Sequence, residues 1–127
     1  MEIGVKNVIE TTVTENNTAV AMGSGTLSVF ATPAMIALIE ETAWRSVVPY
    51  LESGQATVGT RLDISHVSPT PLGMTVKCET ELIEADGRKL KFKAEVYDES
   101  GLIGTCTHER FIITADKFQA KAESKKS

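Results

Sequence analysis

The sequence has few cysteines and histidines, the residues that cross-link a small domain or form most structural zinc sites. Cysteine occurs only at Cys78 and Cys106 among 127 residues, and each lies in a strand-like run without the close Cys or His neighbour that a zinc site needs. We therefore expect both thiols to be reduced and to serve packing. No metal site is expected.

Long apolar runs and an export signal are also missing. No stretch approaches the roughly 20 uninterrupted apolar residues that span a bilayer. Residues 1–7 lack the basic start and the continuous apolar run of a secretory signal. These absences predict a soluble chain that has no membrane partner and resides in the cytoplasm.

Positive charge is in deficit. The 13 Lys and Arg residues are outnumbered by 17 Asp and Glu residues, which gives a net charge of −4 at pH 7. A general nucleic-acid binder needs a basic surface, so that class is excluded. An anionic ligand must instead be met by local positive charge. Residues 88–93 and 117–126 contain candidate basic clusters, for which a solvated surface is the alternative interpretation.

The residues that are present are typical of one globular domain. Hydrophobic residues make up 42% and charged residues 24% of the chain. Its length suffices for one core but not for two cores with a cleft between them. The last residues are polar enough to fray. We expect a single domain over residues 1–118 and a polar tail over residues 119–127.

A long helix is predicted in the first half of the chain. Before it, residues 3–22 are rich in Val and Thr and predict two short strands or one broken strand pair. Thr32 and Pro33 then mark a helix start, with Thr32 as the expected N-cap, and the helix runs to about Val48. Residues 34–39 are apolar on every side, which predicts a central helix enclosed by a sheet.

The remainder of the chain alternates between apolar and polar residues. This period of two, interrupted by turn signals, predicts strands with one buried and one solvated face. The predicted strands are residues 57–67, 74–82, 89–96 and 102–114. Early strands, one apolar helix and four strands joined as a meander predict an α+β architecture, the hot-dog fold, in which an antiparallel sheet wraps around the helix.

Four polar residues lie in or beside segments that are otherwise built for a core: Thr32, Glu40, His66 and Arg110. The Thr32 hydroxyl can cap the helix and also meet a substrate. Glu40 lies on the apolar stripe of the helix, where a carboxylate needs a partner or a raised pKa. A structural and a functional role both remain open for Glu40.

The chain has two histidines. His66 ends a predicted strand before a Pro-rich turn, where packing alone can explain a lone histidine, but a near-neutral pKa also makes it the best general base in the chain. His108 lies in the last predicted strand, on the same face as Arg110 and opposite to Glu109. We interpret His108 as structural.

Five segments, in order along the chain, carry a resemblance to a known family. They are residues 29–40, 49–54, 58–60, His66 with the Pro-rich turn after it, and residues 104–110. Together they resemble the fluoroacetyl-CoA thioesterase family over roughly residues 30–121. Spacings of 8, 26 and 44 residues separate Thr32, Glu40, His66 and Arg110, and their agreement with the family argues against chance.

The resemblance implies a role for five residues. Thr32, Glu40 and His66 match the catalytic threonine, glutamate and histidine of the family, and Gly59 and Arg110 match its substrate-contacting residues. The resemblance also implies a homodimer of hot dogs that holds an acyl-CoA near the subunit interface. No cofactor is implied beyond the CoA of the substrate.

Thioester hydrolysis needs an activated nucleophile and stabilisation of the developing oxyanion. His66 would act as the general base. Glu40 would either orient His66 or attack the carbonyl to form an anhydride, and Thr32 would position the reacting groups. Backbone amides, with Gly59 as a candidate, would face the oxyanion.

One segment departs from the family. In the fluoroacetate-specific members of the family that this chain resembles, a longer segment with aromatic residues forms a lid before the helix. Here the corresponding segment, residues 22–29, is short and contains no aromatic residue. Recognition of fluorine requires a closely shaped apolar enclosure. We therefore expect hydrolysis of a short acyl-CoA without strong fluoroacetyl specificity. A non-catalytic acyl-CoA-binding protein and a hot-dog hydroxyacyl dehydratase are the alternatives.

Overall fold

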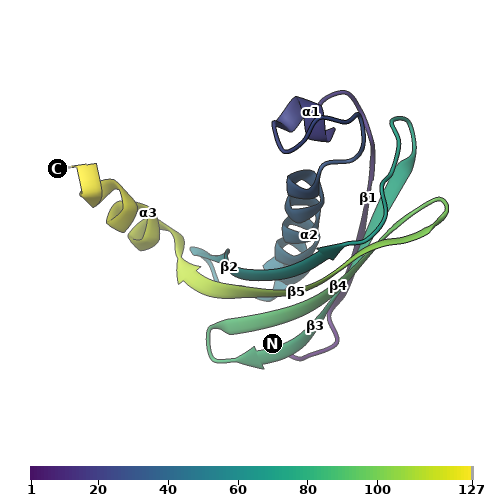
Figure 1. Ribbon diagram of the computed structural model, residues 1–127. Coiled ribbons are helices and arrows are strands. Elements are labelled where there is room, and N and C mark those ends of the chain that lie inside the picture. Colours follow the sequence, from purple (N-terminus) through teal and green to yellow (C-terminus); the bar gives the residue numbers. More distant parts are fainter. Residues whose placement is uncertain (127) are drawn as a thin grey trace.

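A curved antiparallel sheet wraps around one long helix in the computed structural model, which describes residues 1–126 (Figure 1). The strands are β1 (Lys6–Thr12), β2 (Gln55–His66), β3 (Thr75–Asp86), β4 (Lys89–Asp98) and β5 (Gly101–Thr114). Their order in the sheet is β1-β3-β4-β5-β2, and all neighbours are antiparallel. The α+β architecture expected from the sequence is therefore the one observed.

The predicted four-strand meander is wrong in one connection. β3, β4 and β5 do follow one another in the sheet, but β2 pairs with β5 at the opposite edge instead of with β3. The alternation of apolar residues determines which face of a strand is buried and carries no information about its neighbour. As a result β2 is an edge strand that runs past the helix.

The region before the long helix also differs from the prediction. Residues 3–22 form only one strand, β1, followed by a turn and the short helix α1 (Ala19–Met22). Two side chains make this region turn. Asn17 accepts a hydrogen bond from the Thr14 amide and donates to the Thr12 carbonyl, while the Thr18 hydroxyl accepts from the Ala21 amide. Asx and threonine contacts of this kind compete with strand pairing.

The central helix α2 (Thr32–Val47) begins one residue earlier than expected and continues into the 3-10 turn η1 (Val48–Tyr50). Its N-cap is Ala31, so Thr32 and Pro33 occupy the first two helical positions. The prediction of Thr32 as the N-cap is wrong. The helix has no side-chain cap, and the Thr32 hydroxyl is available for another partner.

The core lies between α2 and the concave face of the sheet. Alternate residues of β3 and β4 are buried as predicted, and they meet one stripe of α2. The buried residues are Met35, Leu38, Ile39, Ala43 and Val47 from α2, and Val76, Cys78, Leu82, Leu90, Phe92, Ala94 and Val96 from the two strands. Burial of this apolar surface is the main force that holds the helix on the sheet.

Both cysteines are free and buried, as the sequence predicted. Burial in the apolar interior disfavours the thiolate and raises the pKa of both Cys78 and Cys106 to about 11. These thiols act as small apolar side chains.

The last helix, α3 (Ala115–Glu123), projects away from the sheet and has no buried residue (Figure 1). A final 3-10 turn, η2 (Ser124–Lys126), follows it. The expected boundary at residue 118 falls inside α3, and the division into a domain and a tail stays a prediction. No helix within residues 1–126 is both long and apolar enough to cross a bilayer.

Gly104 allows α2 to approach the sheet closely. A Cβ at this position would lie 2.6 Å from Met35 Sδ and 3.1 Å from the Ser65 carbonyl oxygen. Met35 is fully buried in the first turns of α2, and Gly104 pairs with His66 across the sheet. The glycine therefore sets the spacing between the start of α2 and the end of β2.

We expect Gly104→Ala to lower the free energy of unfolding by about 1–3 kcal/mol, because overpacking forces Met35 or the strand to move. Urea unfolding followed by circular dichroism measures this change. Thr105→Ala, at the exposed neighbouring position of β5, is the matched control. Equal stability of Gly104→Ala and the native chain would show that this close approach imposes no constraint.

Candidate active site

Two polar clusters lie along α2 on the side that β2 covers. β2 runs from the end of α2 back to its start, so His66 meets Thr32 at the first turn, and Gly59 meets Glu40 two turns further on. The first cluster is the Thr32–His66 pair. The second, which we call the Arg110 cluster, comprises Glu40, Thr57, Gly59, His108 and Arg110.

In the first cluster, Thr32 Oγ1 lies 2.8 Å from His66 Nδ1. Thr32 reaches the ring because it is the first residue of α2, and His66 does so because it is the last residue of β2. His66 Nε2 is buried and has no hydrogen-bond partner among the described residues. A cavity of about 300 Å³ opens beside the pair, and Val29, Phe30, Ser68 and Pro69 also line it.

Burial controls the protonation of His66. Loss of solvent lowers the pKa of the imidazole below its usual 6.5, and the backbone of Ser68 acts in the opposite direction. The ring is therefore mainly neutral at pH 7. With its proton on Nε2, the ring accepts the Thr32 hydroxyl hydrogen at Nδ1, which is the arrangement that a general base requires.

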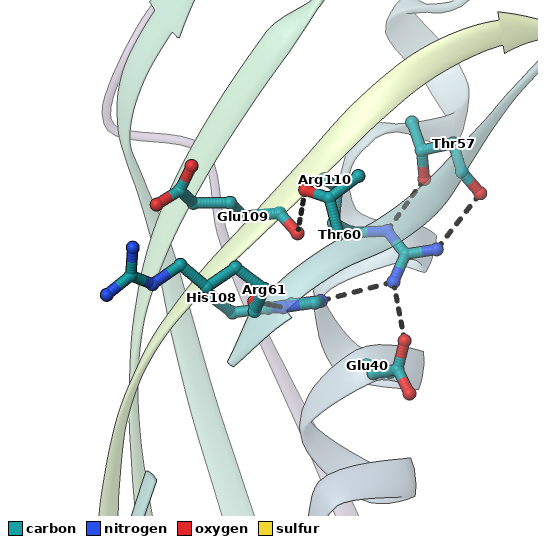
Figure 2. A network of polar contacts seen from close by, with 7 residues as sticks. All are labelled: Glu40, Thr57, Thr60, Arg61, His108, Glu109 and Arg110. Carbon is teal, nitrogen blue, oxygen red and sulfur yellow. Dashed lines mark hydrogen bonds and ion pairs between the residues drawn. The ribbon is translucent and has the colours of Figure 1, made fainter. Parts of the chain in front are cut away.

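The Arg110 cluster is built around a buried guanidinium (Figure 2). Arg110 is 5% exposed and makes four hydrogen bonds. Its Nε donates to Thr57 Oγ1 and its Nη2 to the Thr57 carbonyl, both at 2.9 Å, while its Nη1 donates to Glu40 Oε2 at 3.1 Å. Burial lowers the pKa of Arg110, and the Glu40 carboxylate opposes that shift. The cluster thus joins α2, β2 and β5.

His108 is the third partner of this guanidinium and makes the fourth hydrogen bond (Figure 2). Its Nδ1 lies 2.9 Å from the Arg61 carbonyl oxygen, and its Nε2 lies 3.1 Å from Arg110 Nη1. Burial is the main cause that lowers the pKa of His108, and the positive charge of Arg110 adds to it. The side chain has no exposed surface. The sequence placed His108 on the same face as Arg110 but gave it no partner, and its interpretation as structural stays a prediction.

Gly59 is the point at which β2 passes the cluster. A Cβ at this position would overlap Glu40 Oε2 and would lie 3.3 Å from both Arg110 Nη1 and His108 Cε1. The register of the β2–β5 pairing also shifts between Gly59 and Arg61. A larger residue would have to displace the Glu40 carboxylate, and glycine leaves room for the Glu40–Arg110 pair beneath the strand.

The structure brings some of the predicted residues together and keeps others apart. Thr32 contacts His66, and Glu40 contacts Arg110, but no hydrogen bond joins His66 to Glu40 within residues 1–126. The expected direct contact between the general base and the carboxylate is therefore not formed in one chain. Arg110 also points inward, and Glu40, Thr57 and His108 occupy most of its N–H groups.

Sequence reasoning missed Thr57 and the contacts of His108. The alternation of β5 did place His108 and Arg110 on one buried face, which was a signal that two polar side chains had to find partners there. Within the described chain, no three His, Cys, Asp or Glu residues lie close enough to hold a metal ion. The absence of a metal or cofactor stays a prediction.

Comparison with known proteins decides the family. The model of the family "Fluoroacetyl-CoA-specific thioesterase" matches residues 13–116. The chain belongs to this family. Membership confirms the resemblance seen in the sequence and the enzyme class that it implied, a thioester hydrolase.

Individual relatives agree with this family. A fluoroacetyl-CoA thioesterase from Streptantibioticus cattleyicolor is 40% identical over 97 residues, which cover 76% of this chain and 70% of the relative. A crystal structure of the fluoroacetyl-CoA thioesterase superposes with a TM-score of 0.94 at 33% identity, covering 98% of this chain and 97% of the other. A variant of that enzyme, 32% identical, was solved in complex with acetyl-CoA.

More distant structures support the same architecture. A thioesterase superfamily member from Thermus thermophilus is 27% identical with a TM-score of 0.90, over 98% of this chain and 93% of the other. A hot-dog-like protein from Thermanaerovibrio acidaminovorans, 18% identical with a TM-score of 0.89, covers the same shares and shows the fold alone. The expected hot-dog fold is confirmed.

Proposed function

We propose that this chain hydrolyses short acyl-CoA thioesters to the free acid and CoA, with Thr32, Glu40 and His66 as catalytic residues. The observation that carries the proposal is the contact between Thr32 Oγ1 and His66 Nδ1, which lie 2.8 Å apart beside an open cavity. The relatives named for fluoroacetyl-CoA hydrolysis, one of them solved with acetyl-CoA, support the substrate class.

The proposed reaction uses His66 as the base. When water attacks, the neutral imidazole accepts its proton, an oxyanion forms at the thioester carbonyl, and the CoA sulfur leaves with the proton returned by His66. When the Glu40 carboxylate attacks, no proton is transferred at that step, CoA leaves as the thiolate, and His66 accepts the proton of the water that opens the anhydride. Thr32 positions the reacting groups. The nucleophile is either water or the Glu40 carboxylate, and the latter route passes through an anhydride that water then opens.

Backbone amides are the proposed donors to the oxyanion. α2 begins at the cavity without a side-chain cap, so the positive dipole end of its first turn faces that region. Pro33 has no N–H and the Met35 amide donates to the Ala31 carbonyl, so the candidate donors are the amides of Thr32 and Ala34. The amide of Gly59 is a further candidate, close to Glu40. Stabilisation of the oxyanion by such fixed donors is worth several kcal/mol in acyl transfer.

The residues that line the cavity favour only a modest preference for the fluoroacetyl group over other short acyl groups. Residues 23–29 lead from α1 into the cavity, and Phe30, which is buried, is the one aromatic side chain among its lining residues in the described chain. Within residues 1–126, no tryptophan or tyrosine lines the cavity beside Thr32 and His66. A fluorine atom is therefore poorly enclosed.

We expect thiol release from a panel of acyl-CoA thioesters to be fastest for short chains, with fluoroacetyl-CoA and acetyl-CoA differing in kcat/KM by less than about a hundredfold, or about 2.7 kcal/mol. A thiol-reactive dye measures the rates. A larger fluoroacetyl preference would contradict the argument from the missing lid. Binding of acyl-CoA without any release of thiol would instead favour a non-catalytic binding protein.

Glu40→Gln, His66→Gln and Thr32→Val should each lower kcat on the best thioester, by about a hundredfold for the first two, as loss of general acid–base help does. Glu41→Gln is the matched control, because Glu41 is adjacent to Glu40 but forms only an exposed ion pair with Arg45 at 2.8 Å. Circular dichroism establishes folding. If Glu40→Gln and His66→Gln both retain native turnover, the catalytic assignment is wrong.

We propose a homodimer as the active form. β2 is a 12-residue edge strand whose outer side is unpaired in the described chain, and long free edges invite pairing with another strand. α3 has no buried residue, and a nine-residue helix is marginal without packing. A second copy paired at β2 would cover both features and lie beside α2.

The cytoplasm is the proposed location, since the two free thiols fit a reducing compartment.

Light scattering coupled to size exclusion should give twice the chain mass of 13.7 kDa at micromolar concentration. A sample that remains monomeric over the concentrations used in the activity assay would contradict the dimer.

A further inference from the structure

We propose that His108 is a positioning residue for the hydrolysis: its imidazole, with the proton fixed on Nδ1, holds the Arg110 guanidinium in the orientation that binds Glu40. The inference rests on the proposed function, because it assigns His108 a part in placing one of the proposed catalytic residues.

The two contacts of His108 define its proton position. Nδ1 lies 2.9 Å from the Arg61 carbonyl oxygen, which can only accept, so Nδ1 carries the hydrogen. Nε2 is then an acceptor, and Arg110 Nη1 donates to it at 3.1 Å. The same Nη1 donates to Glu40 Oε2, also at 3.1 Å. One guanidinium nitrogen is thus shared between the imidazole and the carboxylate.

Burial is the main reason why His108 is neutral. The positive charge of Arg110 on β5 also lowers the pKa of His108, whereas the Arg61 carbonyl of β2 and the carboxylates of Glu40 and Glu109 raise it. The Phe92 ring of β4 packs against the imidazole at a centroid distance of 6.2 Å. Protonation would place a hydrogen on Nε2 opposite the Arg110 N–H and a second cation beside the guanidinium. Burial adds to this cost, in agreement with the lowered pKa of His108.

His108 and Arg110 also hold β2 on both sides of Gly59. Arg110 Nη2 donates to the Thr57 carbonyl, and His108 Nδ1 donates to the Arg61 carbonyl. Between these two carbonyls, Gly59 lies directly against Glu40 Oε2. A side chain that merely filled the volume of the imidazole would remove one of the two acceptors of Arg110 Nη1 and the hydrogen bond from His108 to the Arg61 carbonyl.

Two amide substitutions separate these contacts. In His108→Gln the side-chain oxygen reaches the position of Nε2 and can accept from Arg110, whereas in His108→Asn the amide reaches only the position of Nδ1 and can donate to Arg61. Each variant loses one buried hydrogen bond, so their stabilities should fall by similar amounts. Chemical denaturation checks that match.

The kinetic expectation differs between the two variants. His108→Asn should lower kcat by about tenfold or more with a smaller change in KM, since a small misplacement of a catalytic group is costly. His108→Gln should stay within about threefold of the native chain. Equal kcat losses at equal stability would mean that His108 only packs, and the inference would be overturned.

Nitrogen NMR of the imidazoles tests the tautomer without any assay of activity. The chain has two histidines, so the spectrum of His66→Gln assigns His108. His108 should show the Nδ1–H tautomer and titrate below 6.5. An Nε2–H tautomer, or titration at or above that value, would overturn the inference even in an active enzyme. Conversely, a native chain that hydrolyses no thioester but shows the expected tautomer would refute the proposed function and leave the Arg110 contact intact.

Discussion

A single buried cation organises the part of the molecule where the site lies. The Arg110 guanidinium needs acceptors wherever it points, and it takes them from α2 (Glu40), from β2 (Thr57) and from its own strand (His108). Loss of one partner of a buried charge typically costs about 3–5 kcal/mol. The position of the edge strand relative to the helix is therefore fixed by a polar requirement as much as by the apolar core.

Two glycines make this arrangement sterically possible. Gly59 admits the carboxylate beneath β2, and Gly104 admits Met35 beneath β5. Each lies across the sheet from a site residue, Gly59 from Arg110 and Gly104 from His66. The close approach of α2 at these points places Thr32 and His66 within hydrogen-bond distance at one end while Glu40 meets Arg110 further along.

Much of the fold could be predicted because buried residues recur at regular intervals along a strand or a helix. The alternation in β3 and β4 predicted their inner faces correctly, and the all-round apolar start of α2 predicted a helix enclosed by a sheet. The position of β2 next to β5 could not be predicted, since pairing depends on contacts between segments far apart in the sequence. The same holds for Glu40. Its apolar surroundings predicted a partner, but its pairing with Arg110 joins two residues that are 70 positions apart in the sequence.

The inert cysteines have a consequence for an enzyme whose proposed product is itself a thiol. Thiol–disulfide exchange proceeds through the thiolate, and Cys78 and Cys106, both buried with a pKa of about 11, present almost none near neutral pH. Released CoA that becomes oxidised therefore meets no reactive sulfur on the protein. CoA can therefore accumulate in solution without forming mixed disulfides with the folded protein.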